Sequence, residues 1–270
     1  MTAPTSPVRQ VALVPPQHGA WAFLGLPLVV GLAIAPWSPA LLVLAVAWVA
    51  AYPWSYFALA VAKEQTARHP RPERFHRPML LWSCIALPAL LALVLLRPFV
   101  VWWGVVYALA FAVNIGFALR RDDRALINDG VFILECTLLV PVAWAVGAYG
   151  RTWALPSIAA VPTHVWILAI AVGLLLAGST MHVRSFIRER ANARFARMSE
   201  AFAIVSLVIS VALAGWWGLP QGWLLVPAFA FATARSFAMH GSTPRPARIG
   251  MVELVAFVLL AAGAVILGRA

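Results

Sequence analysis

The sequence is poor in charged residues and, above all, in acidic ones. Only 11% of its 270 residues are charged, and 9 Asp and Glu stand against 20 Lys and Arg. Hydrophobic residues make up 63% of the chain, and the mean hydropathy is +0.88. Because a soluble protein needs far more polar surface, this composition excludes that class and indicates a polytopic membrane protein.

The chain also lacks the usual patterns of metal, nucleotide and nucleic-acid sites. Its two cysteines, Cys84 and Cys136, lie inside apolar runs without metal-ligand spacing, and we expect both to be buried. No P-loop, HExxH, GxGxxG or Ser-His-Asp order is present. The net charge of +11 would suggest nucleic acid in a soluble protein. Here the arginines lie between apolar runs, so membrane orientation and anionic lipid account for them.

Nine apolar runs predict an all-α, polytopic bundle of about nine transmembrane helices, since about 20 residues cross a bilayer. They form one domain, residues 17–270, after a flexible cytoplasmic N-terminus, residues 1–16. Pro15 and Pro16 interrupt the first apolar stretch, which favours an uncleaved helix over a signal peptide. Arg97-Pro98 separates the third and fourth runs as either a tight turn or a kink. The predicted cores are Ala20–Ala35, Ala40–Ala62, Met79–Leu96, Val100–Leu119, Gly130–Ala148, Thr163–Phe186, Glu200–Trp216, Gln221–Phe237 and Met251–Leu267.

The connections between these runs alternate in charge. Those after the second, fourth, sixth and eighth runs are basic, whereas the others carry few charges and several tryptophans. The positive-inside rule therefore predicts a multi-pass protein of the bacterial inner membrane, with its N-terminus in the cytoplasm and its C-terminus outside.

The most cationic segment, Gly178–Met198, begins as the tail of an apolar run. If that helix continues, Arg184 and Arg188 lie one turn apart on one face. Two interpretations stay open: the arginines bind an anionic head group, or they only orient the helix and meet lipid phosphates. The other candidate ligands in this segment are His182, Glu189 and Arg190.

A few polar residues lie inside the apolar runs or at their ends. Asn114 fits a helix–helix hydrogen bond or a ligand contact, and Glu135 fits a pocket or a buried pair, because lipid tolerates neither alone. Glu135 and His18 are our candidate catalytic, proton-handling residues, with helix capping as the alternative for His18. We expect Glu200 and Glu253 each to begin a helix, where the helix dipole accounts for a carboxylate.

Two cytoplasmic connections supply the remaining candidate ligands. Lys63 and Glu64 follow the second run, where a local ion pair is the alternative to ligand binding. The segment RRDDRALINDG forms either a solvated turn and a helix start or part of a site. Its candidate ligands are Arg120, Asp123, Asn128 and Asp129.

The chain resembles the YwiC-like family of bacterial membrane proteins in three segments. These are PPQHGAW (15–21), RRDDRALIND (120–129) and VRSFIRERANARF (183–195). The family implies a class of membrane protein and not an activity.

A more distant resemblance, by the order of elements, is to the UbiA superfamily of intramembrane prenyltransferases. PPQHGAW, RHPRPERFHRP, LRRDDRALIND and HVRSFIRER match its conserved segments. The resemblance implies nine helices and an isoprenoid diphosphate held through magnesium on two Asp-rich motifs. This chain departs from both motifs: Glu64 is the only acid at the first, and the second holds His182, Arg184, Arg188 and Glu189. Magnesium therefore loses its usual aspartate ligands, whereas arginine can bind phosphate directly.

These observations predict a membrane protein that binds a phosphate-bearing lipid, with an isoprenoid phosphate as the specific candidate, at a cytoplasmic arginine-rich pocket. Transfer of an isoprenoid group is the activity that the resemblance implies. The alternatives are a transporter or flippase for a small anion or lipid, with Asn114 and Glu135 along its path, and a non-catalytic membrane partner subunit. No metal site is predicted from the residues themselves, and the sequence gives no oligomeric state.

Overall fold

The computed structural model describes residues 11–154, 157–218 and 221–268. These residues form nine α-helices and no strand, which confirms the predicted all-α helix bundle. The α-helices are α1 (His18–Ile34), α2 (Ala40–Gln65), α3 (His76–Leu96), α4 (Val100–Leu119), α5 (Leu126–Ala148), α6 (Thr163–Ile187), α7 (Ala193–Trp217), α8 (Val226–Ala238) and α9 (Pro246–Leu267). Three short 3₁₀ helices connect them: η1 (Pro72–Phe75), η2 (Ile158–Ala160) and η3 (Gln221–Leu225).

Seven helical segments in the described residues are long and apolar enough to cross a membrane, and α1 is a shorter apolar helix. The chain is therefore a multi-pass membrane protein. The predicted eighth run corresponds to η3 followed by α8, and α8 alone has 13 residues.

The seventh and ninth helices begin earlier than the sequence predicted. The side chain of Asn192 accepts a hydrogen bond from the Phe195 amide, so it caps α7 before Ala193. Pro246 opens α9, where its missing amide hydrogen is no loss. Glu200 and Glu253 consequently lie within their helices, and the prediction that each begins a helix is wrong.

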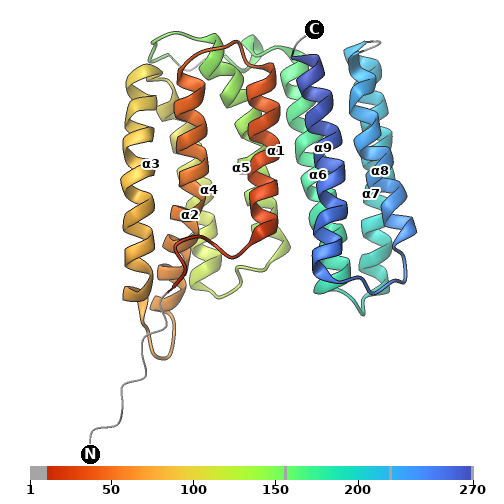
Figure 1. Cartoon of the computed structure of the whole chain (residues 1–270), viewed down its shortest axis with the longest axis horizontal. Coiled ribbons are helices and arrows are strands. Elements are labelled where there is room, and N and C mark those ends of the chain that lie inside the picture. Colours follow the sequence, from red (N-terminus) through yellow and green to blue (C-terminus); the bar gives the residue numbers. More distant parts are fainter. Residues whose placement is uncertain (1–10, 155–156, 219–220, 269–270) are drawn as a thin grey trace, which may run out of the picture.

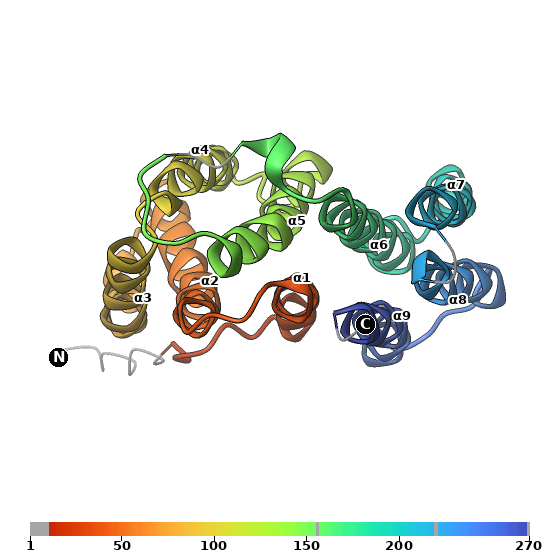
Figure 2. The ribbon, with the colours of Figure 1, turned by 90° about the horizontal axis from the view of Figure 1, so that it is seen from above.

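The helices run side by side and fall into two groups (Figures 1 and 2). One group contains α1 to α5, and the other, which we call the C-terminal bundle, contains α6 to α9. Helix α1 packs against both α5 and α9, and α5 also packs against α6. The two groups therefore meet along α1, α5, α6 and α9.

The core at this junction is apolar and closely packed. Val30, Val172, Leu176 and Leu260 are fully buried in one cluster. A Cβ atom on Gly147 of α5 would lie 2.2 Å from the carbonyl oxygen of Pro36, which follows α1. The two backbones are therefore too close for residue 147 to carry a side chain. Such close approach stabilises helix pairs in lipid, where packing replaces the hydrophobic effect.

The Arg97-Pro98 step joins α3 to α4 at one end of the molecule. Helix α3 ends at Leu96 and α4 begins at Val100, so the step is a tight turn and not a kink. The guanidinium of Arg97 donates from Nε to the carbonyl oxygen of Val146 at 2.9 Å and from Nη2 to Ser38 Oγ at 2.7 Å. The turn is thereby fixed to the ends of α5 and α2.

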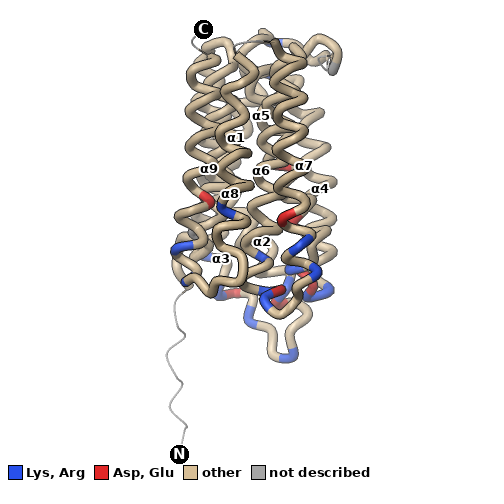
Figure 3. Tube along the Cα trace, turned by 90° about the vertical axis from the view of Figure 1, so that its right-hand side faces the viewer, with Lys and Arg blue, Asp and Glu red and all other residues tan. Residues whose placement is uncertain are grey.

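Most of the lysines and arginines lie at the opposite end, near the start of the described chain (Figure 3). Trp37, Trp153 and Trp216 are strongly exposed, as in an interfacial aromatic belt. Cys136 is buried as expected, but Cys84 is exposed, because it lies on a face of α3 that no other helix covers. The expectation of burial for Cys84 is therefore wrong.

Candidate functional site

The ends of α5 and α6 on the basic side of the molecule bring two arginines to one aspartate. Arg184 Nη1 donates to Asp129 Oδ2 at 2.6 Å and to the carbonyl oxygen of Arg124 at 2.9 Å. Arg188, one turn further along, lies 3.9 Å from the same Asp129 oxygen and 3.4 Å from the same carbonyl. Asp129 stands in the first turn of α5, which begins at Leu126 after an extended Ala125.

The two arginines differ in how exposed they are and in how many of their hydrogen-bond donors are already bonded. The side chain of Arg184 is 13% exposed and that of Arg188 is 41% exposed. The Nε–H of Arg184 is buried and has no hydrogen-bond partner. Arg184 is thus held in place with one donor unused, while most of the Arg188 guanidinium is free to bind an anion.

The neighbouring loop joins Lys63 to Asp123. Their side chains form an ion pair at 2.6 Å, and each is about two-fifths exposed. Burial alone would raise the pKa of Asp123, but the hydrogen bond and positive charge of Lys63 outweigh it and lower that pKa below its usual range. Asn128 Nδ2 donates to the carbonyl oxygen of Asp123 at 3.0 Å, so it ties this loop to the start of α5.

The remaining cytoplasmic candidates lie apart from this cluster. Glu64 pairs with Arg74 and accepts from the Arg71 amide at 3.1 Å, so it has the local role that was its alternative. Glu189 accepts from Asn192 at 2.9 Å. Arg120 and Arg190 are exposed. The backbone of His18 opens α1, but its side chain lies outside the described part of the chain.

Asn114 and Glu135 form a separate pair inside the membrane segment. Asn114 Nδ2 donates to Glu135 Oε1 at 3.3 Å, and Tyr107 Oη donates to the Glu135 carbonyl oxygen at 3.0 Å. These contacts join α5 to α4, whereas Asp129 joins α5 to α6. Among the described residues, no hydrogen bond or ion pair links this pair to the arginine cluster, so the two sets do not form one shared pocket.

A third cluster lies inside the C-terminal bundle, and we call it the buried triad. It consists of Arg235 of α8, Glu253 of α9 and His182 of α6, with side chains that are 4%, 6% and 3% exposed. Arg235 Nη1 donates to Glu253 Oε1 in a short ion pair, and His182 Nε2 lies 3.7 Å from the same oxygen. His182 therefore faces away from the head-group level where the sequence placed it with Arg184.

Sequence reasoning missed Arg235 and Glu253, although a signal was present. Each is the single charged residue of its predicted apolar run. An isolated charge inside the membrane is energetically costly, so two such residues of opposite sign predict an ion pair between their helices. Glu253 was instead assigned to a helix start, and Arg235 was not singled out.

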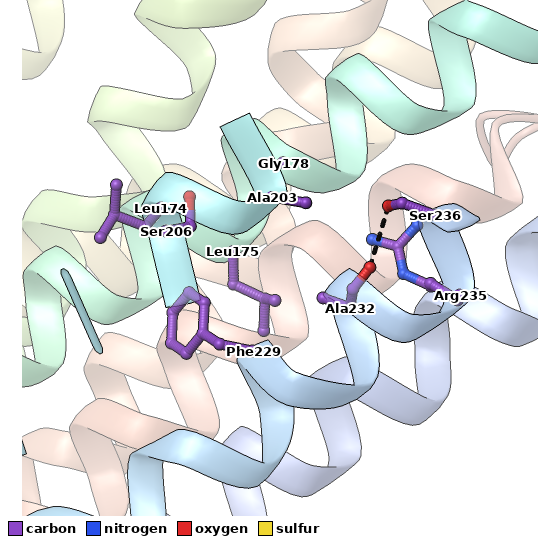
Figure 4. Close-up of a pocket in the computed structure, with 9 residues that line it drawn as sticks. All are labelled: Leu174, Leu175, Gly178, Ala203, Ser206, Phe229, Ala232, Arg235 and Ser236. Atoms are coloured by element: carbon purple, nitrogen blue, oxygen red, sulfur yellow. Dashed lines mark hydrogen bonds between the residues drawn. The ribbon is translucent and has the colours of Figure 1, made fainter. Parts of the chain in front are cut away.

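Two hollows stand out in the described residues, and neither lies at the arginine cluster. One is a cavity of about 10 Å³, the space of roughly one water, beside the buried triad (Figure 4). The other, about 320 Å³, lies at the outer end beside His164 and Trp217. The described residues contain no group of three or more His, Cys, Asp or Glu that could hold a metal.

The acids present do not fit the magnesium that the UbiA resemblance implies. Asp123 forms an ion pair with Lys63, and Asp129 forms one with Arg184. Arginine and histidine stand at the second motif, and neither supplies the hard oxygen ligands that magnesium needs. The residues at these two motifs therefore do not offer magnesium a set of carboxylate ligands.

Comparison with known proteins finds a similar family and a similar protein. Residues 14–144 match the family described as YwiC-like protein. The chain is also 29% identical over 252 residues to the "Uncharacterized protein YwiC" of Bacillus subtilis (strain 168), covering 90% of this chain and 93% of that protein. No solved structure matches the chain, so the UbiA resemblance stays a prediction. The matches confirm the other resemblance: the chain is a helical, membrane-type protein similar to the YwiC-like family.

Proposed function

We propose that this protein binds the phosphate group of a membrane lipid at the cytoplasmic ends of α5 and α6. One observation carries the proposal: Arg184 and Arg188 converge on Asp129, yet only Arg184 is fully engaged there. A phosphate approaching Arg188 would meet a planar guanidinium with free donors beside a second guanidinium that is already held in position. Such charge-assisted, paired hydrogen bonds suit phosphate oxygens.

The charge balance supports an anionic ligand. Arg184 and Arg188 both approach the single carboxylate of Asp129, and the nearby Lys63 and Asp123 neutralise each other. The cluster thus retains an excess of positive charge at the membrane surface. Anionic lipid accumulates at such a surface, within about 10 Å at moderate salt.

The surroundings support a lipid rather than a free anion. Leu126, Ile127 and Ile187 stand next to the cluster in the sequence and are 44%, 70% and 51% exposed. Exposed apolar side chains beside a cationic group are matched by a molecule with a phosphate head and a hydrocarbon tail. An isoprenoid phosphate is the specific ligand we propose, and transfer of its isoprenoid group is the chemical extension that the UbiA resemblance implies.

The test compares lipids that co-purify with the wild-type protein and with two variants. Arg188→Ala removes the partly free guanidinium, and Arg197→Ala removes an exposed arginine of α7 as a control of equal charge. We expect mass spectrometry to find a phosphate-bearing lipid on the wild type and on Arg197→Ala, and several-fold less on Arg188→Ala. Equal amounts of bulk phospholipid on all three proteins would contradict the proposal.

A second candidate function is transport of a small anion or lipid, and the Asn114–Glu135 pair favours it. An amide and a carboxylate that meet at 3.3 Å inside a membrane segment are typical of transport pathways. In proteoliposomes, Glu135→Gln would then abolish movement of a labelled phosphate-bearing lipid or phosphate. If that variant transports as the wild type does, or if the wild type moves neither probe, this candidate fails.

A further inference from the structure

We propose that the buried triad, His182, Arg235 and Glu253, is a proton-binding site inside the C-terminal bundle. The proposal does not depend on lipid binding, because within the described residues no hydrogen bond or ion pair joins the triad to the arginine cluster. Three helices, α6, α8 and α9, each contribute one side chain. The triad therefore forms only when the bundle is assembled.

The composition of the triad exceeds what a structural ion pair needs. Arg235 and Glu253 alone would neutralise each other in the apolar bundle. A third titratable group, His182, lies 3.7 Å from the shared carboxylate oxygen and is almost fully buried. Imidazole takes up and releases protons more readily than any other side chain near neutral pH, so its place here needs an explanation beyond packing.

The triad has two positions where a proton can bind without breaking the Arg235–Glu253 contact. Glu253 Oε1 accepts from Arg235, whereas Glu253 Oε2 is buried, and the hydroxyl of Ser179 is the neighbouring group that can donate to this carboxylate. His182 Nε2 is buried without a hydrogen-bond partner. Because these groups are so close, they take up the proton as one coupled unit.

The acidic groups on the neighbouring helices have partners of their own. On α7, Glu200 pairs with His240 near the surface. On α5, Asp129 pairs with Arg184 and Glu135 with Asn114. Helix α1 contains no Asp, Glu, Lys or Arg, and its one titratable residue is His18. Within the described residues, the charge that a proton adds to the triad is therefore balanced chiefly by Glu253 itself.

A cavity with room for one water lies next to the triad. Arg235 and Ser236 line this space of about 10 Å³ on one side, and Ser206, Leu174 and Phe229 line it on the other (Figure 4). Arg235 Nε and Ser206 Oγ have no hydrogen-bond partner within the protein. One water fits this space and has polar groups to bind, so it can connect Arg235 to the hydroxyl groups of α7 and α8.

The experiment measures proton uptake by the full-length protein in lipid nanodiscs. Infrared difference spectra between about pH 5 and about pH 9 report protonated carboxyl groups and histidine rings. The variants are His182→Gln and the neutral double variant Arg235→Gln with Glu253→Gln, which leaves no unpaired charge. Glu200→Gln, in the surface pair with His240, is the matched control.

We expect the wild-type spectrum to contain a buried carboxyl or histidine signal that both triad variants lose and Glu200→Gln retains. Identical difference spectra for the wild type and both triad variants would overturn the proposal. If a variant does not fold, the test uses the wild type alone. Nitrogen NMR of labelled histidine in D₂O then reports the protonation state of the buried ring across the pH range. A buried ring that keeps one protonation state across the range, with no buried carboxyl band, would also overturn it.

Discussion

Asp129 binds Arg184 at 2.6 Å while Arg188, one turn away on α6, stays 3.9 Å from the same oxygen. The aspartate thus fixes one guanidinium and leaves the other largely unpaired. In such a site the Arg184 guanidinium is held rigidly, whereas the Arg188 guanidinium can adjust to a ligand. Its affinity for an anion is set by the competition between that anion and the Asp129 carboxylate.

The first prediction concerns this competition. Asp129→Asn keeps the size of the side chain and removes its charge, so we expect several-fold stronger retention of phosphate-bearing lipid, from about 1 kcal/mol of relieved competition. Native mass spectrometry of the purified protein measures it. Asp122→Asn, at an exposed site in the same loop, is the control. Weaker retention in Asp129→Asn than in the control would show that positioning of Arg184 matters more.

The second prediction concerns the ion pair of the buried triad. Arg235→Ala or Glu253→Ala leaves the other charge buried alone, so we expect each to destabilise the protein by about 3–5 kcal/mol. A double variant, Arg235→Met with Glu253→Leu, removes both charges and should recover most of that loss. Thermal unfolding in detergent measures the effect. Single variants as stable as the wild type would mean that water reaches the pair.

The third prediction concerns the dependence of stability on pH at Lys63–Asp123. The pKa of Asp123 is lowered in the folded protein, so its contribution is present above the unfolded pKa of about 3.9 and disappears as the pH falls through the lower folded value. We expect Asp123→Asn to lower stability at about pH 7 by no more than about 0.5 kcal/mol, because both side chains are partly exposed. The difference between wild type and variant should vanish in strong acid. A difference that grows there would have the wrong sign.

The fourth prediction concerns the close approach at Gly147. A Cβ atom there would lie 2.2 Å from backbone, which cannot move aside as a flexible side chain can. We expect Gly147→Ala to destabilise the protein by about 1–3 kcal/mol. Gly104→Ala in α4, where nothing lies within 4 Å, should be neutral or slightly stabilising. Equal melting temperatures for the two variants would contradict this packing.

The helices were predictable from the sequence because hydrophobic runs and loop charges are local signals. The spacing of Arg184 and Arg188 is also local, and it places both on one face of α6. The partner of each charge is not local. Arg235 and Glu253 are 18 residues apart on separate helices, so their pairing depends on how α8 and α9 pack. For the same reason the sequence placed His182 with the head-group arginines, although the ring lies inside the bundle.

Helix α1 packs against α9, so two membrane segments that lie far apart in the chain meet. A Cβ atom on Gly268, just after α9, would lie 1.8 Å from the carbonyl oxygen of Ala33, which shows how tightly the two helices are joined. During translation one flank of α1 therefore stays uncovered in the bilayer until α9 is inserted. A chain that stops before α9 would leave that flank uncovered, and quality-control proteases of the membrane would have a simple mark by which to tell an incomplete molecule from a finished one.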